Sequence, residues 1–145
     1  MLNKPKSKVS FFYEKDISLI NRTKLKKFIE GIFLKEKKKL MSLNIVFCSD
    51  QALLEINRKY LKHNYKTDII TFELSAHNMP VEGEIYISVD RVKANAKYLK
   101  ESLNKELHRV IFHGILHLCG YGDKKSQEIK KIRDKEDYYL NQYFE

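Results

Sequence analysis

The sequence has no tryptophan and few residues of several other kinds: two prolines, two cysteines and five glycines among its 145 residues. The two cysteines, Cys48 and Cys119, are too few for the disulfide framework of a small secreted protein. No stretch approaches the roughly 20 apolar residues that a membrane-spanning helix needs, and the first residues lack the apolar segment of a signal peptide. These absences predict a cytoplasmic protein that has no membrane partner.

The scarcity of proline and glycine also leaves no segment that is typical of a linker between domains. The chain has no internal repeat, and 43% of its residues are hydrophobic against 32% that are charged. Such a composition is typical of folded globular proteins, and a chain of 145 residues can bury a core of its own. We therefore expect one domain that spans residues 1–145.

Acidic residues are scarce in the first half of the chain. Residues 1–66 carry 16 Lys and Arg against 6 Asp and Glu, whereas residues 67–145 carry 12 against 13. The net charge of +9 therefore belongs almost wholly to the first half. This asymmetry favours a polyanionic partner such as a nucleic acid, although a lysine-rich solvated surface would give the same count.

Hydrophobic periodicity predicts both strands and helices. β-favouring apolar runs predict strands at residues 9–13, 43–48, 68–74 and 84–89. Helical periodicity predicts helices that begin at Asn21 or Thr23, at Ser49 or Asp50, at Asp90, after Ser102, and at Ser126. The order indicates an α+β fold with one mixed sheet of about four strands and helices packed on it.

The helix predicted at residues 103–118 carries a motif that indicates chemistry, His-x3-His-x2-Gly-x2-Asp. Histidines four residues apart lie on one face of a helix, so His113 and His117 can reach the same ion. Gly120 stands where the helix must stop, and a positive φ there lets the chain turn back. Asp123 then falls where a third ligand could complete the site. The pattern predicts a metal site at the end of this helix, with a fourth position left to water.

A similar spacing occurs in the zinc site of the metzincin peptidases. In this chain, however, Gly114 stands where those enzymes carry their general-base glutamate. The sequence therefore favours a metal hydrolase of another substrate class. Histidines on an apolar helix face can also be satisfied core residues, and this alternative stays open. The other histidines, His63, His77 and His108, have no ligand-like neighbours in the sequence.

Three blocks of the sequence follow one another in a characteristic order. Residues 67–72 read TDIITF and come after Asn57 and Tyr60, and residues 83–88 read GEIYIS. Residues 113–123 then read HGILHLCGYGD. The last block resembles the signature His-Gly-x-Leu-His-Leu-x-Gly-Tyr-Asp-His of the YbeY family of endoribonucleases, and the first two are similar to upstream blocks of the same family.

The resemblance implies an α+β fold and an endoribonuclease that cuts single-stranded RNA in rRNA maturation and ribosome quality control. It implies one Zn²⁺ ion held by His113, His117 and the residue at the family's third histidine, which is Asp123 here. Water activated by the metal, or a 2′-hydroxyl, would attack the phosphodiester. Asp68 and Glu84 lie in the matched blocks and are candidates for the general base, which the motif itself does not supply.

The resemblance also implies an RNA partner, an rRNA precursor, with a ribosomal subunit or ribosomal proteins as further partners. The family has a basic residue after the tyrosine, where this chain has Leu61. Its role in holding phosphate would pass to four neighbouring cations, Arg58, Lys59, Lys62 and Lys66. Two other classes stay open: a non-catalytic RNA- or ribosome-binding protein whose metal is structural, and a zinc peptidase.

Overall fold

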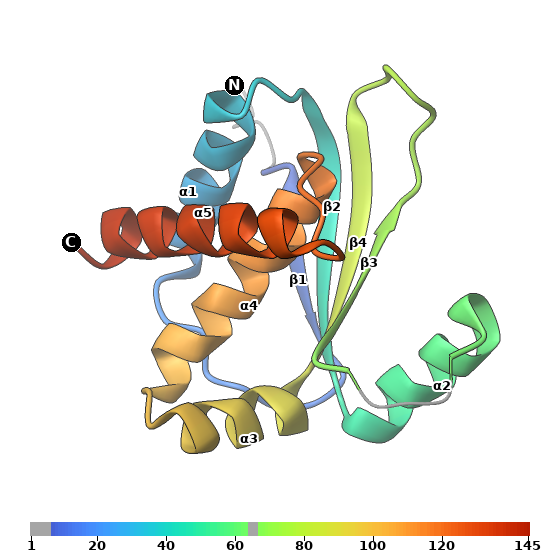
Figure 1. Cartoon of the computed structure of the whole chain (residues 1–145), viewed down its shortest axis with the longest axis vertical. Coiled ribbons are helices and arrows are strands. Elements are labelled where there is room, and N and C mark those ends of the chain that lie inside the picture. The colour runs from blue at the N-terminus through green and yellow to red at the C-terminus, as the bar shows by residue number, and fades with distance from the viewer. Residues whose placement is uncertain (1–6, 64–66) are drawn as a thin grey trace, which may run out of the picture.

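The computed structural model describes residues 7–63 and 67–145 as four strands and five helices (Figure 1). The strands are β1 (Val9–Tyr13), β2 (Leu40–Cys48), β3 (Ile69–Glu73) and β4 (Val81–Ser88). The helices are α1 (Arg22–Lys35), α2 (Asp50–Leu61), α3 (Val89–Leu99), α4 (Leu103–Leu118) and α5 (Ser126–Phe144). None of the described helices combines the length and the apolar character that crossing a bilayer requires.

The strands form one mixed sheet in the order β1-β2-β4-β3. β1, β2 and β4 run parallel, and β3 pairs antiparallel with β4. Parallel neighbours need a crossover connection, which α1 supplies between β1 and β2. The predicted α+β fold with one mixed sheet of four strands is confirmed.

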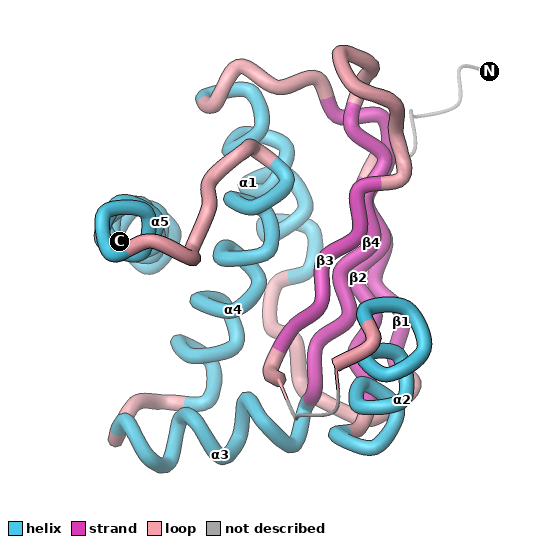
Figure 2. The backbone as a smooth tube through the Cα atoms, turned by 45° about the vertical axis from the view of Figure 1, so that its right-hand side comes forward, coloured by secondary structure: helices cyan, strands magenta, loops and turns pink. Residues whose placement is uncertain are grey.

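The two faces of the sheet are covered unequally. Figure 2 shows α1, α4 and α5 on one side of the strands and α2 on the other. Because side chains alternate along a strand, Leu43, Ile45 and Phe47 of β2 all enter the larger core, with α1, α4 and α5. A smaller cluster on the opposite face joins Cys48 to Leu53 of α2.

Two predicted caps are confirmed, Ser49 of α2 and Ser102 of α4, whereas α3 begins at Val89, one residue before the predicted Asp90, and is capped by Ser88. The side chains of Ser49, Ser88 and Ser102 accept hydrogen bonds from backbone N–H groups in the first turns of α2, α3 and α4. Asn21, a predicted cap of α1, has a left-handed backbone (φ 59°), and its side chain makes no capping bond. Thr23, the alternative cap, lies inside the helix.

Two strands are longer at their N-terminal ends than the hydrophobic runs predict. β2 begins at Leu40 and β4 at Val81, three residues before the predicted starts. These two residues pair with each other, so the ladder between the parallel strands extends beyond both apolar runs. Pairing of the neighbouring strand, rather than local sequence, sets these boundaries.

Helix α4 lies very close to the sheet at Gly114, next to the first histidine of the motif. A Cβ atom on Gly114 would lie 2.7 Å from Cδ1 of Ile69 and 2.9 Å from Cδ1 of Ile85, both closer than carbon atoms normally approach. The absence of a side chain at this position therefore fixes the distance between the helix and the sheet.

Gly114→Val should lower the free energy of unfolding by about 1–3 kcal/mol, because the added carbons overfill a packed interface. Gly31, inside α1, is the matched control, since a Cβ atom on it would meet no other atom within 4 Å. Gly31→Val should change stability by less than about 0.5 kcal/mol, given the similar helix propensities of the two residues. Urea unfolding measures both; equal effects would contradict the proposed close contact.

Candidate metal centre

The last turns of α4 and the loop that follows bring His113, His117 and Asp123 together. Nε2 of His117 lies 3.0 Å from Nε2 of His113 and 3.1 Å from Oδ2 of Asp123, and the third distance, from His113 Nε2 to Asp123 Oδ2, is 3.5 Å. Gly120 has a φ of +102°, which ends the helix and lets the chain turn back. The turn predicted at this glycine is confirmed.

Hydrogen bonds at the other ring nitrogens fix the direction of both imidazoles. Nδ1 of His117 donates to the carbonyl oxygen of Tyr121 at 2.8 Å, and Nδ1 of His113 lies 2.7 Å from a carboxylate oxygen of Glu136. A nitrogen that donates carries the proton, so in the neutral rings both Nε2 lone pairs point toward Asp123.

Three electron-rich atoms that face one another at 3.0–3.5 Å repel unless a cation lies between them. Tetrahedral zinc with bonds of about 2.0–2.1 Å separates its ligand atoms by about 3.3 Å, which is the size of this triangle. Two imidazoles and a carboxylate are ordinary zinc ligands. His113, His117 and Asp123 therefore fit a metal ion and could hold one with three protein ligands.

The charges around His113 favour a cation. Burial disfavours the charged imidazole, but the hydrogen bond and charge of Glu136, with further carboxylates at Asp68 and Asp123, outweigh burial and raise the pKa of His113. The histidine side chains are 23% and 25% exposed and Asp123 is 43% exposed. The centre is thus open to a substrate on one side.

Glu136 of α5 contacts the cluster, and the sequence motif does not indicate it. Its side chain is 8% exposed, and besides His113 it lies 3.7 Å from Nη1 of Arg109. Carboxylates in this position orient a ligating histidine and raise its basicity. One signal in the sequence could have found it, because Glu136 lies on the apolar face of α5 with Ile132 and Leu140.

A second carboxylate, that of Glu36 after the end of α1, is 11% exposed and holds the loop that follows α4. It accepts hydrogen bonds from the hydroxyls of Tyr121 and Tyr139, and Nζ of Lys135 lies 3.3 Å away. The backbone carbonyl of Tyr121 in turn accepts the Nδ1 proton of His117. Glu36 therefore supports His117 through one intermediate residue.

Two neighbouring cavities of about 570 and 680 Å³ meet at the cluster, and Asp68, His113 and Asp123 line both. Burial raises the pKa of Asp68, partly opposed by the charge of His113, and its carboxylate accepts a hydrogen bond from Asn95. Glu84 lies elsewhere. It pairs across the strands with Phe72, on the sheet face that α2 covers, and accepts a hydrogen bond from Tyr86. The structure brings Asp68 to the cluster and leaves Glu84 away from it.

The predicted phosphate-binding cations lie around the C-terminal end of α2. Arg58, Lys59 and Lys62 are exposed there, while Lys66 falls outside the described residues. Leu61, at the family's basic position, lines the 570 Å³ cavity together with the histidine pair. The end of α2 is thus adjacent to the cluster.

The remaining histidines and cysteines have other surroundings. His108 is buried and stacks on Tyr143, whereas His63 lines the 570 Å³ cavity. Cys48 and Cys119 are buried free thiols, and burial raises the pKa of both to about 12. Neither thiol belongs to the group of ligand atoms that converge at the cluster.

Comparisons with known proteins identify a family and a similar fold. The family model described as "Endoribonuclease YbeY" matches residues 10–144. A protein of that name from Cytophaga hutchinsonii is 44% identical over 138 residues, covering 94% of this chain and 96% of the relative. One from Flavobacterium psychrophilum is 41% identical over 132 residues, covering 91% and 94%. A solution structure of a Thermotoga maritima protein superposes with a TM-score of 0.66 at 27% identity, covering 94% of this chain and 89% of that one.

Glu136→Gln should weaken Zn²⁺ binding about 10–100-fold, because the amide is uncharged and orients His113 less strongly. Competition with a chromogenic chelator measures the affinity without any assay of activity. Asp137→Asn is the matched control, since Asp137 bonds Arg109 and is 56% exposed. Affinities that fall equally in both variants would contradict a specific role for Glu136.

Glu36 should make the stability of the protein depend on pH in the acid range. Burial alone would raise its pKa, but the hydrogen bonds from Tyr139, Tyr121 and Lys135 outweigh burial and lower the pKa below its ordinary value of 4.5. A carboxylate with a lowered folded pKa stabilises the protein above the unfolded pKa, and this contribution is lost as the pH falls through the folded pKa.

Glu36→Gln should therefore cost about 1–3 kcal/mol at pH 7, and the difference from wild type should shrink as the pH falls below 4.5. Urea unfolding at a series of pH values measures it. The exposed Glu82 is the control, and Glu82→Gln should give a small difference at every pH. A cost of Glu36→Gln that stays constant down to a pH of about 3 would contradict the assignment.

Proposed function

This chain belongs to the YbeY family of endoribonucleases, and on that premise we propose that it is a zinc-dependent endoribonuclease that cuts single-stranded RNA. The observation that carries the proposal is the convergence of three ligand atoms within 4.8 Å of one another, from His113, His117 and Asp123. Only three protein ligands converge there among the described residues, and such a set is typical of catalytic rather than structural zinc.

In this proposal each residue near the cluster has a separate task. A zinc ion held by the three ligands would lower the pKa of a water molecule and polarise a phosphoryl oxygen. Asp68 lines both cavities at the cluster, so its carboxylate can accept a proton from an attacking water or 2′-hydroxyl. Arg58, Lys59 and Lys62 at the end of α2 would hold the RNA phosphates.

The substrate class follows from family membership and from the site. The cluster lines two cavities, where an unpaired strand could lay its backbone against an ion held by the three ligands. We infer that the RNA is an rRNA precursor, cut during maturation or quality control of the ribosome, with a ribosomal subunit as a further partner. A cytoplasmic location, consistent with two free thiols, belongs to the same proposal.

Position 114 argues against peptidase chemistry. The peptidases with this spacing carry a general-base glutamate directly after the first histidine. Here the residue is glycine, and its Cβ position faces Ile69 and Ile85 in the packed interface with the sheet. A glutamate side chain would have no room at this position, so the site lacks the peptidase base for a structural reason.

The experiment compares cleavage of a single-stranded RNA, the same RNA as a duplex, and casein by the full chain loaded with Zn²⁺. We expect cleavage of the single strand alone. Asp123→Ala and Asp123→His form a matched pair, because histidine is the family's residue at this position. The alanine variant should fall below roughly 1% of the wild-type rate, whereas the histidine variant should keep both bound zinc and cleavage.

Three outcomes would contradict the proposal. Casein cleavage without RNA cleavage would assign the site to a peptidase. Less than about half an equivalent of bound zinc after loading, measured by elemental analysis, would contradict a catalytic ion. Full RNA cleavage by Asp123→Ala would show that the chemistry takes place elsewhere.

A further inference from the structure

A cleft of about 430 Å³ lies beside His117, in addition to the cavity that borders α2. It is formed by the loop between α1 and β2, by the loop between β3 and β4, and by the end of α4. We propose that this cleft, which we call the lysine cleft, binds backbone phosphates of the RNA through Lys37, Lys38, Lys39 and His77. The inference rests on the proposed function and extends its substrate path beyond α2.

The charge of the lysine cleft is positive. Its lining includes three consecutive lysines and His77, against a single acidic residue, Glu73, among the described residues. Lys37, Lys38 and Lys39 are all exposed, and no described carboxylate lies within ion-pair distance of them. The neighbouring carboxylate of Glu36 is occupied by two tyrosine hydroxyls and Lys135. The three ammonium groups are therefore available to an anion.

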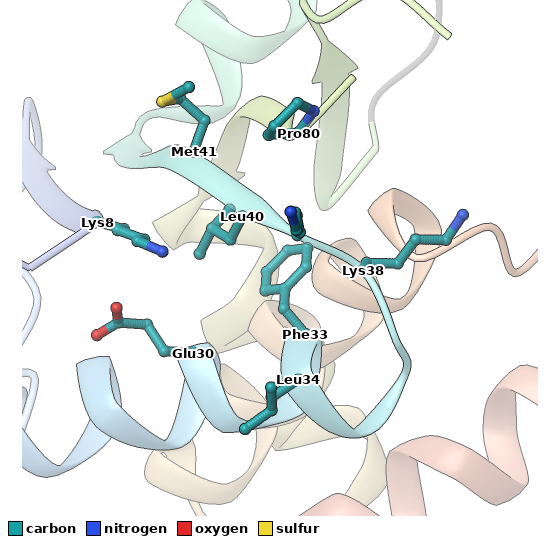
Figure 3. A pocket seen from close by; sticks show the side chains of 9 residues that line it. Lys8, Glu30, Phe33, Leu34, Lys38, Leu40, Met41 and Pro80 are labelled. Atoms are coloured by element: carbon teal, nitrogen blue, oxygen red, sulfur yellow. The ribbon is translucent and has the colours of Figure 1, made fainter. Parts of the chain in front are cut away.

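Lys38 and Lys39 lie between the lysine cleft and a second cavity, and they line both. That cavity, about 420 Å³, is lined largely by apolar side chains such as Phe33 and Leu40. Figure 3 shows the Lys38 side chain extending outward, away from this apolar lining. Lys38 lines the lysine cleft together with His117 and Gly120, which places it near the end of α4. Desolvation against apolar side chains is costly for an ammonium group, so the lysine stems can lie along them while the charges stay in water.

The lysine cleft and the cavity at α2 are adjacent. Both are lined by Glu73, His117 and Leu118, so a strand that passes from one to the other would pass beside a proposed zinc ligand. In Figure 1 the loop from α1 to β2 and helix α2 lie at opposite ends of the sheet, with the end of α4 on the side of that loop. A single-stranded RNA held at both places would pass its backbone over the cluster.

The chemistry of this surface fits a flexible polyanion better than a folded protein. Lysine acts as a point charge with three rotatable donors, which suits phosphates whose positions vary along a single strand. Exposed lysines contribute to binding mainly by releasing counterions from the nucleic acid, and this contribution is independent of base sequence. The lysine cleft would thus position the RNA strand, and other groups would determine where the strand is cut.

The test measures binding of a 2′-O-methyl RNA of about 12 nucleotides in EDTA, so that no cleavage occurs, at several salt concentrations. The triple variant Lys37→Asn, Lys38→Gln, Lys39→Gln removes the three charges; asparagine is chosen because Lys37 has a φ of +60°. We expect affinity to fall at least about tenfold at about 0.1 M salt. The slope of log K against log salt should decrease by about 0.7 for each phosphate that the variant no longer neutralises.

A matched control removes the same charge elsewhere. Lys27, Lys93 and Lys97 are exposed, and none of them lines a cavity at the cluster. Changing all three to Gln should alter RNA affinity less than about twofold, since a general decrease of net charge acts weakly at distance in salt. Thermal unfolding of both triple variants establishes that each is folded.

The outcomes separate this inference from the proposed function. If the cleft variant and the control variant bind RNA with equal affinity, the proposed role of the lysine cleft is overturned, whichever substrate the wild type cleaves. If the Lys37, Lys38 and Lys39 triple variant binds RNA more weakly than the wild type, the lysine cleft is supported. If the wild type also fails to cleave unmodified RNA, the proposed nuclease activity is contradicted while the cleft is retained. If the triple variant in the cleft loses more affinity for polyglutamate than for RNA, the cleft is assigned to an acidic protein and the RNA proposal is overturned.

Discussion

The packing of α4 against the sheet is the constraint on which the rest of the structure depends. Ten of its 16 residues are buried, and it contacts α1, α3, α5, β3 and β4. The same helix carries His113 and His117, so the residues that form the core also set the position of the candidate site. Both imidazoles are carried by α4, so they would move together if the helix shifted. Because protein interiors are close-packed and barely deformable, the packing of α4 holds them in place.

Positioning the helix does not by itself orient the side chains, and two distant segments complete that task. Glu136 of α5 holds the Nδ1 proton of His113, and Glu36 beyond α1 holds the loop whose carbonyl group receives the Nδ1 proton of His117. Both carboxylates are largely buried and both interact with cations, Arg109 and Lys135 respectively. The short motif supplies the ligand atoms, and the tertiary structure supplies their direction.

Those parts of the structure that depend on local pattern could be predicted from the sequence. The ends of α4, the turn at Gly120 and the mixed sheet of four strands follow from helical spacing, glycine chemistry and apolar runs. What could not be predicted depends on pairing across the fold: the early starts of β2 and β4, the distance of Glu84 from the cluster, and the role of Glu136. A carboxylate on an apolar helix face indicates a buried partner, but its identity is set by tertiary contacts.

The charges around the cluster offer a physical explanation for the uneven distribution of charge along the chain. Carboxylates from Asp68, Asp123 and Glu136 act on His113, which favours a cation but repels the phosphates of an RNA. The groups that attract the strand must therefore lie outside this negative region yet close to it. The cations at the end of α2 and the lysines of the lysine cleft meet that requirement, and all of them come from the first 66 residues, where Lys and Arg number 16 against 6 acidic residues. In the proposed function the substrate and the ion require fields of opposite sign, and the fold brings lysines of the first 66 residues next to a cluster whose carboxylates all come from the rest of the chain.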